Sequence, residues 1–156
     1  MITGFSHLHN VLRWVVLILL IWAIVKGIMA WTSGKKYDPK DRKPFLFTLI
    51  ASHVQLVLGL VLYLVGPWRD VVANQLLETE ALARFERFWK MEHITLMLLA
   101  IVLITLGHSR LKKDGPDTKR YRSATIMFIV ALLMILAAIP WPFWGEPVAR
   151  GLFPGQ

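Results

Sequence analysis

The sequence predicts an all-α integral membrane protein, an up-down bundle of four helices that forms a single domain over residues 1–156. Hydrophobic residues make up 56% of the chain and charged residues 18%, whereas an average soluble domain has roughly 25% charged residues. Four apolar runs dominate the sequence, at residues 11–31, 45–66, 94–107 and 124–143. Because a helix of about 20 apolar residues crosses a bilayer core, we predict membrane-spanning helices at about 9–31, 45–66, 89–109 and 123–143.

The four runs differ in charge and in length. The first contains Arg13 and Lys26 and spans the membrane if the Lys26 side chain snorkels to the surface. No small-residue cleavage site follows it, so we interpret it as a helix rather than a signal peptide. The second and fourth runs carry no charge. The third run is short, and it reaches spanning length if its helix enters the membrane at Trp89.

Basic residues predict the orientation. The segments 35–43 and 110–122 hold 5 and 6 Lys or Arg, together 11 of the 18 in the chain. These segments are the first and third connections, so they lie on one side, and the positive-inside rule places them in the cytoplasm. Both termini are then extracytoplasmic. Because topology accounts for the net charge of +8, we expect the lipid bilayer, and no nucleic acid, as a partner.

The connection between the second and third helices is predicted to be an amphipathic surface helix. Within residues 69–90 apolar side chains recur at helical spacing, and Glu80/Arg84 and Glu86/Lys90 are i,i+4 pairs. We expect this helix to lie on the outer membrane surface and to run into the third helix, with Trp68 at the same boundary. The tail at 140–147, rich in proline and aromatic residues, should end the fourth helix and pack at the outer interface.

The chain has no cysteine, which excludes disulfides, thiolate metal sites and iron–sulfur clusters. The sequence also shows no HExxH motif, no paired intramembrane carboxylates and no phosphate-binding glycine loop. Ionisable residues inside membrane helices are costly, so each is a functional candidate. The candidates are His7, His9, Arg13, Lys26, His53, Glu92, His93 and His108.

Two of these histidines are predicted to lie at similar depth. His9 is about 33 Å from Trp31 along its helix, and His93 is about 6 Å below the outer boundary at Trp89. The first and third helices lie diagonally in an up-down bundle, so the two imidazoles could hold a haem iron between them. Arg13 lies one turn from His9 and could pair with a haem propionate or with Glu92. His7 lies on nearly the opposite face from His9, so we expect only one of these two to point inward.

His53 lies about 12 Å above the inner boundary, too far from His93 for both to bind one iron. It either serves a second, inner site, with Met134 at similar height, or is structural and hydrogen-bonded to a carbonyl, a hydroxyl or a water. We favour the structural role. His108 is expected to be solvated.

The segments 7–14, 52–60, 87–93 and 139–143 resemble landmarks of small bacterial four-helix membrane proteins labelled cytochrome b or cytochrome-b-like, over nearly the whole chain. The resemblance implies a multi-pass protein of the bacterial cytoplasmic (inner) membrane that binds haem b, and it draws attention to His9 (or His7), His53 and His93. A weaker likeness is to half of a haem A synthase bundle.

These observations predict a b-type haem protein that moves electrons within the membrane, an electron-transfer component rather than a stand-alone enzyme. Candidate partners are quinone, subunits of a respiratory complex, or further copies of the chain. Two alternatives stay open. The first is a cofactor-free accessory or assembly subunit of a membrane complex, and the second is a quinone- or metal-binding membrane protein.

Overall fold

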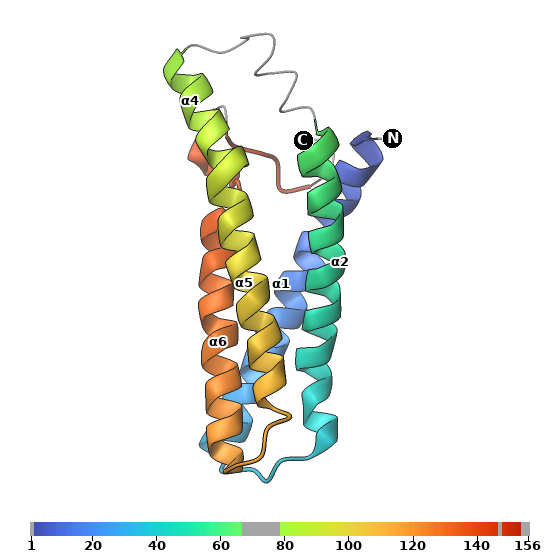
Figure 1. The fold of residues 1–156 in the computed structure, drawn as a ribbon, viewed down its shortest axis with the longest axis vertical. Coiled ribbons are helices and arrows are strands. Elements are labelled where there is room, and N and C mark those ends of the chain that lie inside the picture. Colours follow the sequence, from blue (N-terminus) through green and yellow to red (C-terminus); the bar gives the residue numbers. More distant parts are fainter. Residues whose placement is uncertain (1, 67–78, 147, 154–156) are drawn as a thin grey trace.

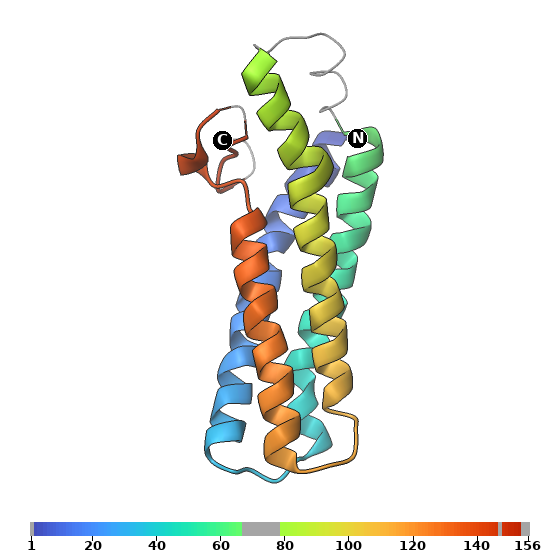
Figure 2. The ribbon, with the colours of Figure 1, turned by 60° about the vertical axis from the view of Figure 1, so that its left-hand side comes forward.

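The structure, a computed structural model, describes residues 2–66, 79–146 and 148–153. These residues form helices and connecting segments, with no strand among them. Four long helices lie side by side with their axes along the length of the molecule (Figures 1 and 2). They are α1 (Ile2–Thr32), α2 (Lys43–Val65), α5 (His93–Arg110) and α6 (Asp117–Ala138). The shorter elements are η1 (Pro39–Arg42), α4 (Thr79–Arg87), the π-helical turn η2 (Phe88–Glu92) and η3 (Pro142–Trp144).

The helices have the length and composition of membrane spans. Four stretches qualify among the described residues, namely Ile2–Thr32, Pro39–Val65, Glu80–Arg110 and Asp117–Ala138. Large apolar side chains point away from the bundle, with Ile18 66% exposed and Val57 and Leu133 each 61% exposed. In water such surfaces would be costly, whereas lipid tails cover them without penalty. The prediction of a multi-pass membrane protein is therefore confirmed at this level.

Contacts between helices define their neighbours. α1 packs against α2 and α6, and α5 packs against the same two helices, so α2 and α6 separate α1 from α5. The core between them contains Leu20, Ile104 and Phe128, all fully buried. Gly107 lets α5 approach α6, because a Cβ atom there would lie 2.8 Å from the Phe128 ring. Small residues at helix contacts are typical of membrane bundles.

The helix ends differ from the sequence prediction in two places. α1 begins at Ile2 rather than near residue 9, so its first turns continue the helix beyond the apolar run. α6 spans Asp117–Ala138 rather than 123–143. It ends early because Pro140 has no N–H to donate and restricts the residue before it, and Ile139 is accordingly extended.

The expected surface helix is the main correction to the fold. α4 does not lie across the end of the bundle; it continues through η2 into α5 as one rod (Figures 1 and 2). Residues 79–106 contain no glycine or proline, so nothing in this stretch favours a break in the helix. The predicted Glu86–Lys90 pair forms, but Arg84 donates to the Trp144 carbonyl oxygen at 2.6 Å. Residues 69–78 of the expected helix, and Trp68, lie outside the described residues.

The C-terminal segment folds back onto the start of α1. The Arg13 guanidinium and the Trp14 indole both donate to the Leu152 carbonyl oxygen, at 2.8 and 3.0 Å. The Trp14 ring also stacks on Phe153, with centroids 6.0 Å apart. Both ends of the described chain therefore lie at one end of the bundle (Figure 1), where they help to build a cavity.

Candidate functional site

A cavity of about 510 Å³ lies at the end of the bundle that holds both termini. Its volume is within the range of about 300–1,000 Å³ that small-molecule sites occupy. Its walls come from α1, α2, the α4–α5 rod and the C-terminal segment. The polar side chains that line it are Ser6, His7, His9, Asn10, Arg13, Gln55, Tyr63, Trp89, His93 and Arg150.

Helical spacing explains how these side chains converge. Gln55, Gly59 and Tyr63 are four residues apart on α2 and share one face. On the rod, Trp89 and His93 are also four residues apart, in and directly after the π-helical turn. Such turns are rare and occur frequently at functional sites.

The His93 side chain has a fixed ring orientation. Its Nδ1 lies 2.8 Å from the Ala138 carbonyl oxygen of α6. A carbonyl can only accept, so Nδ1 carries the proton, and the lone pair of the neutral imidazole is on Nε2. Histidines that bind metals typically donate their second ring N–H in this way. A metal bound by His93 would therefore be coordinated through Nε2.

His9 enters the cavity from α1. Its ring packs against Gly59 of α2, where a Cβ atom would lie 3.2 Å from the ring Cε1. The Gln55 side-chain amide donates to the His9 carbonyl oxygen at 2.9 Å and ties α2 to α1 at this level. The Nδ1 atom of His9 is buried and has no partner in the described part of the chain.

Four further buried polar atoms around the cavity also lack partners among the described residues. They are Asn10 Oδ1, Arg13 Nε, Gln55 Oε1 and Trp89 Nε1. An unsatisfied buried donor or acceptor costs about 1–3 kcal/mol, and such groups are few in native proteins. With His9 Nδ1 included, five such atoms surround one cavity, and a ligand or water with polar atoms of its own would satisfy them.

The charges at the cavity are positive. Arg13 and Arg150 line it, and no lining residue among those described is acidic. The Arg150 guanidinium lies 5.3 Å from the centroid of the Trp89 ring. Burial lowers the Arg150 pKa, and Glu146 opposes this by raising it, but an arginine stays protonated at neutral pH. The cavity therefore favours a ligand that carries negative charge.

His7 lies at the margin of this site, and His53 lies outside it. His7 contributes to the cavity wall but is itself exposed. His53 is exposed on α2 and does not line the cavity; its Nδ1 lies 2.8 Å from the Leu49 carbonyl oxygen in its own helix. Met134 packs against the core instead.

One expectation from the sequence is wrong, and one of the two partners considered for Arg13 pairs elsewhere. His108 was expected to be solvated, but it is buried, with 5% of its surface exposed, because the rotation of α5 turns it toward the bundle. Glu92 was a candidate partner of Arg13. It forms an ion pair with Arg87 at 2.7 Å instead, since both lie on the same rod about one turn apart.

Several cavity residues have no counterpart in the sequence analysis. Asn10, Gln55, Tyr63 and Arg150 were not candidates there, and Trp89 was considered only as an interface marker. The available signal was the eight-residue spacing of Gln55 and Tyr63, about two helical turns, in a largely apolar helix.

No group of three or more metal-ligating His, Asp or Glu side chains gathers within residues 2–66, 79–146 and 148–153. Comparison of the chain with protein-family models, with curated proteins and with solved structures finds no match.

Proposed function

We propose that the chain binds haem b between His9 and His93 and transfers electrons within the cytoplasmic membrane. The observation that supports this most is that the two imidazoles enter one cavity from helices that α2 and α6 separate. His93 is anchored through Nδ1, and the His9 Nδ1 atom has no partner among the residues that the structure describes. A haem held by both histidines would have no coordination position left for oxygen, and such a centre would suit electron transfer.

The remaining cavity residues fit the same group. Haem b supplies a one-electron redox centre when bound. Arg13 and Arg150 provide the positive charge that propionate carboxylates need. Gly59 leaves room for the His9 ring. Met97 and Ile101 add an apolar wall to the cavity, which would exclude water from a bound haem.

The orientation that we propose is that of an up-down bundle with both termini extracytoplasmic. The two basic segments lie together at the end opposite to both termini (Figure 1), and the positive-inside rule assigns that end to the cytoplasm. The haem site then lies near the outer surface of a bacterial inner membrane. A membrane quinone or a subunit of a respiratory complex is the partner that this location favours.

The direct test is haem quantitation on the detergent-purified chain by the pyridine haemochrome method. We expect haem b in the wild-type chain, and its loss in both His9→Ala and His93→Ala. His53→Ala is the matched control, because His53 lies outside the cavity, and it should retain haem. A colourless wild-type protein would refute the proposal and favour a cofactor-free accessory subunit.

A second candidate function is quinone binding in the same cavity. The specific observation is that two buried donors, Trp89 Nε1 and Arg13 Nε, have no acceptor within the described part of the chain. Quinone carbonyl oxygens accept hydrogen bonds and could pair with them. This alternative predicts a purified protein without a Soret band that releases quinone into organic solvent. It also predicts that Trp89→Phe reduces the quinone content.

A further inference from the structure

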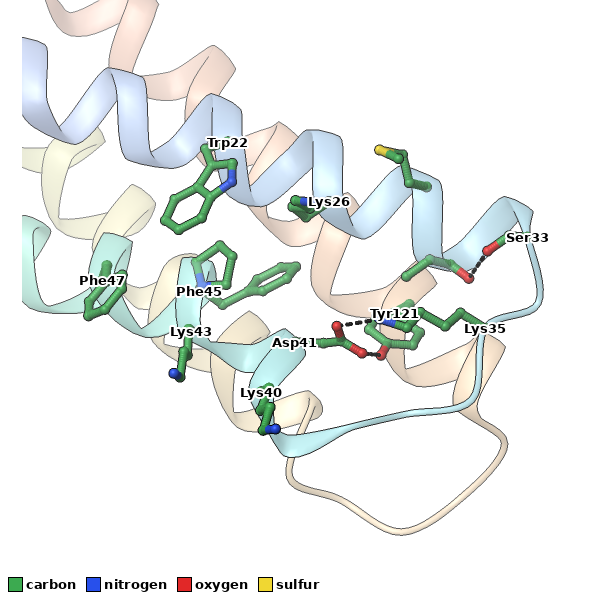
Figure 3. A pocket seen from close by; sticks show the side chains of 13 residues that line it. Trp22, Lys26, Ser33, Lys35, Lys40, Asp41, Lys43, Phe45, Phe47 and Tyr121 are labelled. Carbon is green, nitrogen blue, oxygen red and sulfur yellow. Dashed lines mark hydrogen bonds and ion pairs between the residues drawn. The ribbon is translucent and has the colours of Figure 1, made fainter.

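A second cavity, of about 440 Å³, lies at the opposite end of the molecule, between the C-terminal half of α1 and the start of α2 (Figure 3). Four lysines line it, Lys26, Lys35, Lys40 and Lys43, together with one acidic residue, Asp41. None of these residues contributes to the haem-site proposal. The cavity therefore needs an explanation of its own.

The single carboxylate is already neutralised within the wall. Asp41 accepts from the Lys35 ammonium at 2.5 Å and from the Tyr121 hydroxyl at 2.7 Å, as the dashed lines in Figure 3 show. The ammonium groups of the other three lysines have no partner among the described residues. Four lysines and one aspartate leave a net charge of +3 at the cavity.

The same cavity has an apolar part deeper along the helices. Trp22 lies four residues before Lys26 on α1, and Phe47 lies four residues after Lys43 on α2. Each helix therefore places an aromatic ring about 6 Å further from the loop than a lysine on the same face. The two rings stack, with centroids 6.3 Å apart and an angle of 17° between their planes. Both remain open to a neighbour, at 40% and 45% exposed.

Lysines near the loop followed by aromatic rings deeper along the helices suit an amphiphilic ligand, with a charged head and an apolar tail. A free anion would need only the lysines, but the exposed aromatic pair continues the site in the direction of the membrane interior. Basic pockets between membrane helices bind the headgroups of anionic lipids, and Lys26 has an apolar stem that lets its ammonium group stay at the surface. The phosphate, the glycerol and the first part of an acyl chain would each meet a wall of suitable chemistry.

We propose that this cavity is a binding site for an anionic phospholipid. Its phosphate lies against Lys26, Lys40 and Lys43, and an acyl chain lies along Trp22 and Phe47. The inference requires that the chain spans a membrane, but it does not depend on haem at the opposite end.

Native mass spectrometry of the detergent-purified full chain tests this, with phosphatidylglycerol or phosphatidylcholine titrated in. We expect the wild-type chain to retain phosphatidylglycerol in preference to phosphatidylcholine. Each lysine near a lipid headgroup contributes about 1 kcal/mol, so Lys26→Gln with Lys43→Gln should weaken phosphatidylglycerol binding about 30-fold. The control is Lys112→Gln with Lys113→Gln, an equal change of charge in the other basic loop, which should leave binding unchanged.

Two further arms identify the ligand. Trp22→Ala should reduce retention of phosphatidylglycerol, and soluble glycerol phosphate should not displace the lipid. Full displacement by glycerol phosphate, with no effect of Trp22→Ala, would show a plain anion site and overturn the proposal. Equal losses in the two double-lysine variants, or no preference for phosphatidylglycerol in the wild-type chain, would overturn it as well. Circular dichroism melting confirms that each variant is folded.

Discussion

Replacing Gly59 should change the haem affinity and the thermal stability of the bundle in opposite directions. A Cβ atom at this position would lie 3.2 Å from Cε1 of His9, whereas carbon atoms normally pack about 3.5–4.0 Å apart. The imidazole must therefore move by a few tenths of an ångström. At the same time, alanine gains about 1 kcal/mol of helix propensity over glycine. The haem site and the fold thus respond in opposite directions.

Changes in the groups that orient a metal ligand typically cost 10–100-fold in affinity. We expect the effect of Gly59→Ala to lie near the lower end of this range, with the haem Kd raised about tenfold. This is equivalent to a loss of about 1.4 kcal/mol in binding free energy. Gly59→Leu should lose more, because its side chain also fills part of the cavity. The melting temperature of the haem-free chain should be unchanged or slightly higher in Gly59→Ala.

The assay is a haem titration of the haem-free chain, followed by the Soret band, together with circular dichroism melting. The matched control is Gly4→Ala on α1, because a Cβ atom at Gly4 meets nothing within 4 Å; its haem affinity should equal that of the wild type. A Gly59→Leu chain that binds haem as tightly as the wild type would refute the location of His9 at the iron.

Three further predictions follow from the same structure. Lys36→Cys, in a chain without native cysteine, should resist an impermeant thiol reagent in intact cells and react after lysis. Labelling in intact cells would show the opposite orientation. His53→Gln should leave haem stoichiometry unchanged, because His53 faces away from the cavity, and a fall in haem per chain would give His53 a ligand role. Gly107→Ala should lower the melting temperature, because its Cβ would lie 2.8 Å from Phe128 and overpacking costs about 1–3 kcal/mol, more than the helix propensity gained.

The helical spans could be predicted from the sequence because the thickness of the bilayer sets the length of an apolar run. The start of α1 and the path of α4 could not be predicted in this way. Polar residues outside the hydrocarbon core are compatible with helix or loop, so the apolar run alone does not show where α1 begins. Amphipathic spacing shows that a helix has a polar and an apolar face, but it does not give the direction of the helix axis. The axis of α4 continues that of α5 instead of lying along the membrane surface.

The heights of His9 and His93 along the bundle could be predicted from the sequence, but the directions in which side chains point around each helix axis could not. Counting 1.5 Å per residue placed His9 and His93 at one level, and the structure brings both to one cavity. The same count says nothing about which way a side chain points, so His108 was expected in solvent and is buried. The π-helical turn before His93 makes side-chain directions on this rod harder still to predict, because spacing rules assume 3.6 residues per turn.

Low-temperature electron paramagnetic resonance of the oxidised, purified protein tests the central claim most directly. With His9 and His93 both on the iron, we expect a low-spin ferric signal in the wild type. Each single alanine variant at these positions that still holds haem should change to high spin, because one axial position opens. His53→Ala should keep the low-spin signal. A wild-type sample without ferric haem, or a low-spin signal that survives in both His9→Ala and His93→Ala, would contradict the account.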